Sequence, residues 1–167
     1  MAEIKILKDP IIRKAAINDL KDILRLNHEL FLEEDREFDQ TQDIKWTLGK
    51  KGKKFFRDVI IKKDNFCEVI GNKNKIIGYL NGGMAKKILW RKEARYAYLG
   101  SIFIEKKFRQ AGLGTQLVEN FINWCRKNRV DYLSVTAFAQ NNFGIKFYKK
   151  FGFKDYDLTL QKKIYNE

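Results

Sequence analysis

The sequence predicts a single α/β domain whose mixed β-sheet follows the order β-α-α-β-β-β-α-β-α-β. Three observations support this: apolar residues at helical spacing near the N-terminus, an apolar hairpin pattern in the middle, and a glycine-rich strand-to-helix turn in the C-terminal half. Hairpins make antiparallel neighbours, whereas a strand–helix–strand connection favours a parallel one. The sheet should therefore contain both kinds of pairing.

Size and composition favour one compact domain spanning 1–167. The chain has 167 residues, 44% of them hydrophobic, and Pro10 is its only proline. No apolar run approaches the ~18 residues of a membrane span, and the N-terminus lacks the apolar core of a signal peptide. We expect a cytoplasmic protein with no membrane partner. Cys67 and Cys125 form no metal-binding pattern, so we expect two reduced, partly buried thiols and no metal.

The N-terminal third predicts one strand and two helices. Ile11–Ile17 has strand character, and Asn18 is suited to cap the amphipathic helix that follows, from Asp19 to about Glu34. The segment Gln42–Lys63 has a weaker pattern, with a short helix near its end.

Three strands follow. Phe66–Ile70 and Lys75–Leu80 flank the turn Gly71–Asn74 and predict a hairpin. Asn81–Gly83 predicts a bulge or kink in the second of these strands. Ala94–Ile104 predicts a long, aromatic-rich third strand.

The C-terminal third alternates helices and strands. A helix follows Gly114, and Tyr132–Phe138 predicts the next strand. Asn141 or Asn142 is placed to cap a short helix, which Gly152 is suited to end in a left-handed conformation. Phe153–Leu160 predicts a last strand.

The glycine-rich turn carries most of the chemical information. Ile102–Thr115 reads IFIEKKFRQAGLGT, a strand that runs through a basic turn into a helix. Glycines let backbone N–H groups approach a ligand, and the first N–H groups of a helix are free to bind an anion such as a pyrophosphate. A Walker A loop needs Gly-Lys-Ser/Thr, but Gly114 is followed by Thr115 and Gln116; a Rossmann turn needs a third glycine where Leu117 stands. A kinase loop lies in a hairpin instead.

The remaining pattern, R-x-x-G-x-G after a strand, resembles the acetyl-CoA motif of the GNAT acetyltransferase family. A second run, TAFAQNNFGIKFYKKFGF from Thr136 to Phe153, is similar to the family's C-terminal part. It has Asn141, then the aromatic–tyrosine pair Phe147-Tyr148, then Gly-Phe before the final strand. The resemblance implies the GNAT fold, a single layer of six to seven strands flanked by helices.

The resemblance also implies a cofactor site. The pantetheine arm of acetyl-CoA should pair with the backbone of Ile102, Phe103 and Ile104, with the Ile104 N–H binding the acetyl carbonyl and stabilising the oxyanion. Asn141 should bind the pantetheine arm, and Lys146, Lys149 and Lys150 are candidates for the adenosine end. The residues placed by position at the pyrophosphate are Arg109, Gln110, Ala111, Gly112, Leu113, Gly114 and Thr115.

Tyr148 is the catalytic residue that the resemblance implies. It would protonate the departing CoA thiolate, because a phenol with a pKa near ~10 is matched to a thiol near ~8.5. The general base is open: the strand offers Tyr96, Tyr98 and Ser101, and no carboxylate before Glu105. A water chain or an acid from the N-terminal half are the alternatives.

An acidic cluster in the N-terminal half suggests the acceptor. Six acids fall between Glu29 and Asp39, in a chain whose net charge is +13. Glu33, Glu34 and Asp35 are our candidates for attracting a cationic amine such as a polyamine, an aminoglycoside or a peptide amine; a solvated helix end is the plainer interpretation. His28, the only histidine, has the character of a surface or structural residue.

The sequence thus favours an acetyl-CoA-dependent N-acetyltransferase with an amine acceptor, and the family implies a homodimer. Two alternatives stay open. A CoA-binding protein without catalysis would explain the missing strand carboxylate. A nucleic-acid-binding protein would explain the charge, although the basic residues are scattered and no nucleic-acid-binding motif is present.

Overall fold

The computed structural model describes residues 10–72, 75–87 and 89–165. The chain forms two compact units, Met1–Thr136 and Ala137–Glu167. A single domain over 1–167 stays a prediction. Within the described residues, no helix has the length and apolar character needed to cross a membrane.

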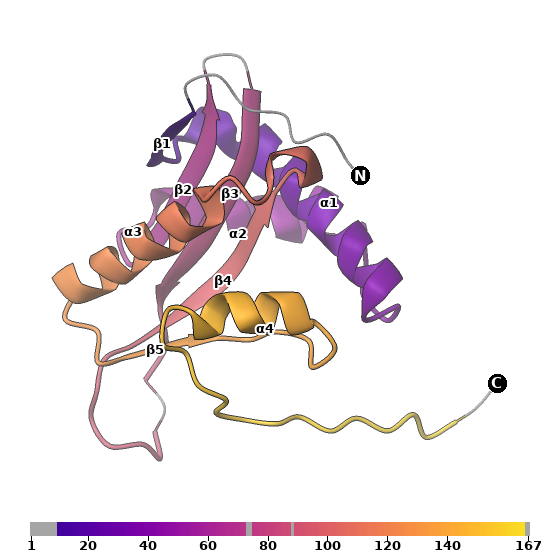
Figure 1. The fold of residues 1–167 in the computed structure, drawn as a ribbon, viewed down its shortest axis with the longest axis vertical. Helices are drawn as coiled ribbons and strands as arrows, with labels where there is room; N and C mark the ends of the chain where they lie inside the picture. Colours follow the sequence, from indigo (N-terminus) through magenta and orange to yellow (C-terminus); the bar gives the residue numbers. More distant parts are fainter. Residues whose placement is uncertain (1–9, 73–74, 88, 166–167) are drawn as a thin grey trace. The chain divides into compact units, whose positions relative to one another are not determined.

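The first unit contains the sheet and three of the α-helices (Figure 1). In chain order its strands and α-helices are β1 (Ile11–Lys14), α1 (Leu20–Glu37), α2 (Lys50–Ile61), β2 (Asn65–Asn72), β3 (Lys75–Met84), β4 (Tyr96–Ile104), α3 (Leu113–Lys127) and β5 (Tyr132–Val135). Short 3-10 turns precede α1, α2 and the glycine-rich turn, at Ile17–Asp19, Trp46–Leu48 and Lys106–Phe108.

The strands lie side by side in the order β1-β2-β3-β4-β5. The first four are antiparallel neighbours, and β5 runs parallel to β4, as the strand–helix–strand pattern predicted. The predicted hairpin is confirmed as β2–β3, although Lys73 and Asn74 of its turn lie outside the described residues. The mixed α/β sheet is therefore confirmed.

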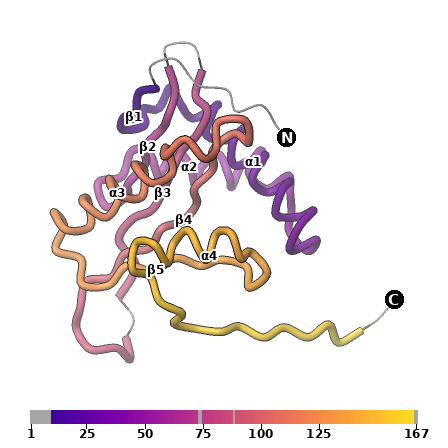
Figure 2. Tube along the Cα trace, viewed as in Figure 1, coloured from indigo at the N-terminus to yellow at the C-terminus, as the bar shows by residue number. Residues whose placement is uncertain are grey.

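Helices cover both faces of this sheet, with α1 and α2 on one face and α3 on the other (Figures 1 and 2). On the α1/α2 face, apolar side chains from both helices pack with Val69, Tyr79 and Phe103 of the strands in one buried cluster. On the α3 face, Phe121 packs against Phe66, with ring centroids 5.0 Å apart. Burial of these two apolar faces is the main source of stability for a layered fold of this kind.

The cap of the first helix differs from the prediction. Asn18 lies inside the 3-10 turn, and Asp19 makes the polar contacts at this end. The Asp19 carboxylate accepts a hydrogen bond from the Ala16 N–H. It also forms an ion pair with Arg13 at 2.7 Å. Asp19 is buried, and its bond to Arg13 lowers the pKa of the carboxyl. The prediction of Asn18 as the cap was wrong because Asp19 satisfies both a backbone donor and a cation.

The predicted irregularity is present, but the extra residue belongs to the neighbouring strand. Asn81 pairs with Ser101 and Gly82 pairs with Leu99, so Gly100 of β4 has no opposite residue. One extra residue of this kind is a β-bulge, which bends the strand that carries it. The bend therefore lies in β4, directly before the predicted cofactor-binding stretch.

The second unit contains α4 (Asn142–Lys149) followed by an extended segment. Asn141 caps α4 by accepting the Gly144 N–H at 2.8 Å, and Gly152 has φ of 87°, as predicted. The predicted last strand, Phe153–Leu160, is wrong: these residues form no strand, and Leu158 and Leu160 are exposed. The described sheet consequently has five strands, and the predicted six to seven are not seen.

Candidate functional site

The end of β4 is open on the side that faces β5. The parallel pairing runs from Tyr96 opposite Tyr132 to Leu99 opposite Val135, and there it stops. β4 continues through Gly100–Ile104 while it pairs with β3 on its other side. A stretch of strand backbone with an unpaired edge can accept an extended ligand as an additional strand.

The backbone of Ile104 points toward this open edge. The Glu105 N–H donates to the Ile77 carbonyl of β3 at 2.9 Å. In a trans peptide the preceding carbonyl points the opposite way, so the Ile104 carbonyl faces away from β3. In an extended strand the N–H and carbonyl of one residue share a side, and Ile102 repeats this orientation two residues earlier. The two N–H groups are thus directed where the predicted pantetheine arm would pair.

The glycine-rich turn follows at the N-terminus of α3. Gln110 and Gly112 both have positive φ, 66° and 78°, which folds the chain tightly before the helix. The first helical hydrogen bond here runs from the Gln116 N–H to the Gly112 carbonyl. The backbone N–H groups before Gln116 therefore take no part in the hydrogen bonds of the helix. Gly112 has no side chain with which to cap them. Gln110, Ala111 and Gly112 are exposed, whereas Leu113 is buried and anchors the turn in the core. The turn is therefore suited to bind a pyrophosphate.

Arg109, which the sequence assigned to the pyrophosphate, makes three contacts within the protein. Its Nε donates to the Ile104 carbonyl at 2.7 Å, and its Nη2 lies 2.9 Å from both carboxylate oxygens of Glu33. Its guanidinium also lies 5.0 Å from the ring centre of Phe103. The side chain therefore connects α1 to the end of β4. It donates a hydrogen bond to the carbonyl of Ile104, the residue whose N–H is predicted to stabilise the oxyanion.

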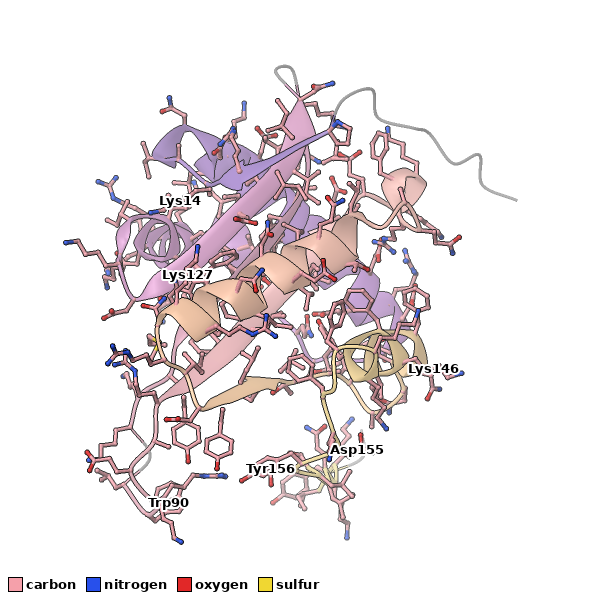
Figure 3. The ribbon with its side chains drawn as sticks, turned by 60° about the vertical axis from the view of Figure 1, so that its left-hand side comes forward. Lys14, Trp90, Lys127, Lys146, Asp155 and Tyr156 are labelled. Carbon is pink, nitrogen blue, oxygen red and sulfur yellow. The ribbon has the colours of Figure 1, made fainter. Side chains whose placement is uncertain are left out.

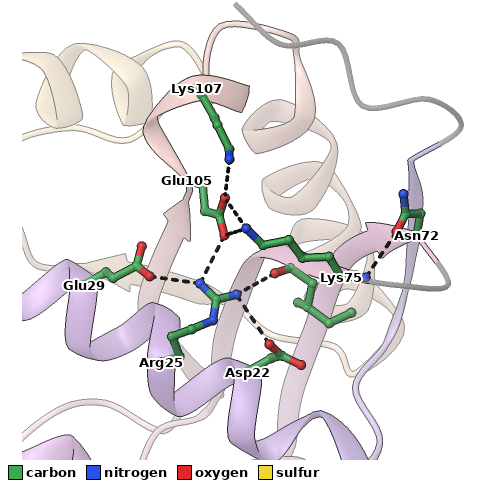
Figure 4. A network of polar contacts seen from close by, with 8 residues as sticks. Asp22, Arg25, Glu29, Asn72, Lys75, Glu105 and Lys107 are labelled. Carbon is green, nitrogen blue, oxygen red and sulfur yellow. Dashed lines mark hydrogen bonds and ion pairs between the residues drawn. The ribbon is translucent and has the colours of Figure 1, made fainter.

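Glu105, the first carboxylate after β4, forms ion pairs with three basic side chains (Figure 4). It is buried and lies 2.8 Å from Lys75 and 3.1 Å from Arg25, with Lys107 at 3.7 Å. Arg25 donates further to the Ile76 carbonyl at 2.7 Å. Three cations around one buried carboxylate fix the end of β4 to α1 and β3. This arrangement suits a structural role for Glu105 better than a basic one.

The acidic candidates on α1 differ in their surroundings. Glu33 is paired with Arg109, whereas Glu34 accepts a hydrogen bond from Gln42 Nε2 at 3.2 Å. Burial raises the pKa of Glu34, against the effect of the Gln42 bond and together with the charges of Asp39 and Glu33. Gln42 Oε1 is buried with no hydrogen-bond partner among the described residues. Asp35 is half-buried.

The cysteines and the histidine have structural surroundings. Cys67 and Cys125 are free, as predicted, but they are buried and not only partly so, and burial raises the pKa of Cys125 to about 11. Burial also raises the pKa of Cys67. The His28 Nδ1 lies 2.8 Å from the Ile44 carbonyl. Neither thiol is therefore a ready nucleophile at neutral pH.

A buried polar chain on the α1/α2 face was missed by the sequence reasoning. Asn27, Tyr79 and Asn81 are almost fully buried, and their side chains connect through hydrogen bonds to Ser101 of β4. A signal was present: Tyr79 and Asn81 are two residues apart on a strand and so share a face. Their contact with Ser101 depends on the register between β3 and β4, which could not be predicted from the sequence.

Comparison with known proteins identifies the family. The profile of the acetyltransferase (GNAT) family matches residues 18–153. The chain belongs to the GNAT family. An uncharacterised N-acetyltransferase of Methanocaldococcus jannaschii is 27% identical over 161 residues, which are 92% of this chain and 65% of that protein. The chain thus spans less than two thirds of the length of this relative.

Solved structures share the GNAT fold. A mutant of the BH1408 protein from Bacillus halodurans superposes with a TM-score of 0.80 at 16% identity, covering 93% of this chain and 99% of that one. The aminoglycoside N-acetyltransferase AAC(6')-Iy, solved in complex with CoA, superposes with a TM-score of 0.71 at 14% identity, covering 93% and 94%. At these identities the likeness shows the fold alone.

The other residues assigned from the GNAT motifs lie in the second unit. Tyr148 is half-buried and packs edge-on against Phe147 and Phe153, with ring centroids 5.5 and 5.8 Å away. Asn141 caps α4, and Lys149 forms an ion pair with Asp155 at 2.9 Å. Lys146 and Lys150 are exposed. Their roles toward acetyl-CoA stay predictions.

The basic side chains of this GNAT protein are distributed over many elements. Figure 3 labels Lys14 on β1, Lys127 at the end of α3 and Lys146 on α4. Trp90, on the loop between β3 and β4, is 85% exposed. Distribution over separate elements does not define one polyanion-binding face of the kind that nucleic-acid-binding proteins use.

The contact between Arg109 and Glu33 should be measurable as a coupling free energy. Both side chains are about one-third exposed, so we expect about 1 kcal/mol of coupling from a double-mutant cycle of Arg109→Ala and Glu33→Ala, measured by urea unfolding. The matched control is Arg36–Glu37 on the same helix, whose side chains are 65% and 54% exposed and should show almost none. Equal coupling in the two pairs would contradict the role given to Arg109.

Proposed function

We propose that this protein is an acetyl-CoA-dependent N-acetyltransferase that moves an acetyl group to a primary, cationic amine. The amine attacks the thioester carbon directly, the bond to sulfur breaks, and Tyr148 protonates the departing CoA thiolate. The Ile104 N–H binds the acetyl carbonyl. The pyrophosphate lies on the turn from Gln110 to Thr115.

One observation carries this proposal: the open backbone edge of β4 leads directly to an exposed anion-binding turn. Among the described residues, no strand pairs with Gly100–Ile104 on the β5 side, and the turn before α3 begins only a few residues later. A ligand that combines a peptide-like arm with a pyrophosphate matches this arrangement, because the arm needs backbone groups and the phosphates need helix N–H groups. Acetyl-CoA is such a ligand.

Direct attack agrees with the chemistry of the described residues. An acetyl-cysteine intermediate would need a thiolate, but burial raises the pKa of both cysteines. An oriented amine, in contrast, needs only to lose a proton. An ammonium of pKa ~10.4 is neutral in about one molecule in 2500 at pH 7, so the site must favour its deprotonation or bind it in position.

The surroundings of Glu34 support a cationic acceptor. The two carboxylate oxygens of Glu34 are hydrogen-bond acceptors near the end of α1, and Gln42 Nε2 donates to one of them. An ammonium group has three donors and no acceptor, so it complements such a pair. The solved aminoglycoside N-acetyltransferase gives one class of cationic amine to test, and polyamines and peptide amines are the others.

A CoA-binding protein without catalysis is the second candidate. The specific observation in its favour is Glu105, the nearest carboxylate to the strand, which three cations occupy. Tyr148, which catalysis needs and binding alone does not, argues for the enzyme.

The test of the reaction is thiol release from acetyl-CoA in the presence of spermidine, kanamycin A, free amino acids or a lysine-bearing peptide. We expect amine-dependent release with one of the cationic classes, and the acetylated amine should be detected by mass spectrometry. Binding of acetyl-CoA without release with any amine would favour the non-catalytic candidate. Absence of binding in folded protein would refute both.

Tyr148→Phe should lower kcat by about 10²- to 10⁴-fold, the range that a general acid contributes, while KM for acetyl-CoA changes little. The measurement is steady-state thiol release. Tyr156→Phe is the matched control, because Tyr156 lies in the same unit and is 70% exposed. A kcat reduced by less than threefold would remove Tyr148 from the mechanism.

Glu34→Gln should separate binding from stability. Because the folded-state pKa of Glu34 is raised, its charge opposes folding above that pKa, and the penalty disappears as pH falls. The variant should therefore be as stable as the unsubstituted protein at pH 7, or more stable, while KM for the cationic amine rises about tenfold. The measurements are urea unfolding and amine titration.

The control for Glu34→Gln is Glu119→Gln on the exposed surface of α3, which should change neither quantity. An unchanged amine KM in Glu34→Gln would show that the acids at the end of α1 only solvate the helix.

A further inference from the structure

A chain of side-chain hydrogen bonds crosses the core on the α1/α2 face. Thr47 Oγ1 donates to Asn27 Oδ1 at 2.5 Å, and Asn27 Nδ2 donates to the Tyr79 hydroxyl at 2.8 Å. The Tyr79 hydroxyl lies 2.9 Å from Ser101 Oγ, which donates to Asn81 Oδ1. Four of the five side chains are almost fully buried; Ser101 is the part-exposed end of the chain.

The direction of the hydrogen bonds follows from counting protons. Burial raises the pKa of the Tyr79 hydroxyl, so it keeps its proton. It accepts from Asn27, and its own proton is therefore donated to Ser101. A serine hydroxyl has one proton and two lone pairs. The Ser101 proton is donated to Asn81 and one lone pair accepts from Tyr79, which leaves one lone pair without a partner in the part of the chain that the structure describes.

Ser101 holds this open lone pair next to the proposed cofactor edge. It is the second residue after the last β4–β5 pair and directly precedes Ile102, whose backbone N–H faces the open edge. The bulge residue Gly100 makes the arrangement possible, because a Cβ there would lie 2.7 Å from Asn81 Nδ2 and displace the amide. The bulge lies where the β4–β5 pairing ends, and it leaves Asn81 opposite Ser101.

We propose that Ser101 is a catalytic residue whose open lone pair accepts a hydrogen bond from the N–H of the attacking amine. This inference rests on the proposed acetyl transfer. The amine nitrogen forms the new bond to the acetyl carbon, the carbon–sulfur bond breaks, and the surplus amine proton leaves to solvent water. Ser101 keeps its own proton throughout.

The polarity of the chain suits this role. The nitrogen gains positive charge as it attacks, and a hydrogen-bond acceptor fixed beforehand stabilises that charge, whereas a donor would oppose it. Because Tyr79 and Asn81 determine where the Ser101 proton lies, the hydroxyl cannot rotate to present its proton to the amine without breaking two hydrogen bonds. Tyr79 is accordingly a positioning residue that acts through Ser101.

The experiment compares Ser101→Ala, Ser101→Thr and Tyr79→Phe in thiol release with whichever of spermidine, kanamycin A or the lysine peptide reacts fastest. Ser101→Ala should lower kcat about tenfold, with KM for acetyl-CoA unchanged. Ser101→Thr keeps the hydroxyl and should restore kcat to within about threefold. Ser134→Ala on exposed β5 is the matched control and should retain full activity. Thermal unfolding checks each variant.

Two further readouts distinguish an orienting hydroxyl from a structural one. Tyr79→Phe should lower kcat about threefold by itself and have no further effect in the Ser101→Ala background, since it acts through that hydroxyl. The pH dependence of kcat should keep its shape in Ser101→Ala, because a serine does not titrate in this range.

Three results would overturn the inference: full kcat in Ser101→Ala, an additive Tyr79→Phe effect, or a shifted pH profile in Ser101→Ala. Should Ser101→Ala not fold, reduced kcat in folded Tyr79→Phe with preserved kcat in Ser101→Thr supports the inference, and unchanged kcat in Tyr79→Phe opposes it. If the unsubstituted protein releases no thiol with any amine, the proposed function fails and this inference falls with it. An active unsubstituted protein with a fully active Ser101→Ala refutes only the inference.

Discussion

Beyond Leu99, the edge of β4 that faces β5 loses its hydrogen-bonding partner, and the rest of the candidate site is built around this unpaired backbone. An open edge is costly, since backbone groups without partners must be solvated or bound by something else. Arg109 meets part of this cost by donating to the Ile104 carbonyl, while the Ile104 N–H on the same edge is the group that we propose binds the acetyl carbonyl. The Ile104 carbonyl is therefore held within the protein, whereas the Ile104 N–H is the group assigned to the ligand in the proposed function.

Charged side chains hold this edge in place from two directions. Glu105 is fixed by cations from α1 and β3 on the side away from β5, and Glu33 fixes Arg109 from the C-terminal half of α1. Partly buried ion pairs with several hydrogen bonds restrict geometry more than they add stability. We infer that α1 serves to position the end of β4, so that changes in this helix should be felt at the proposed oxyanion group.

Local signals in the sequence were enough for much of the fold, but contacts between distant residues were not. The glycine-rich turn, the β2–β3 hairpin and the Asn141 cap each depend on neighbouring residues, and all three are confirmed. The contact of Arg109 with Glu33 joins residues 76 positions apart, and nothing local in the sequence predicts it. Phe153–Leu160 has apolar residues with strand propensity, but a strand also needs a partner edge, which propensity does not provide.

In the proposed reaction, Glu34 and Ser101 complement different protonation states of one amine. Glu34 carries a charge that folding disfavours, and such a penalty is expected where a group is kept for binding instead of stability. In the proposed reaction it attracts the ammonium form, which dominates at neutral pH. Ser101 offers only a lone pair and so complements the neutral amine as it attacks and gains charge. A carboxylate on the strand itself would combine both tasks in one group; in the proposed reaction they are divided between α1 and β4, so that the absence of an acid from β4 is compatible with catalysis.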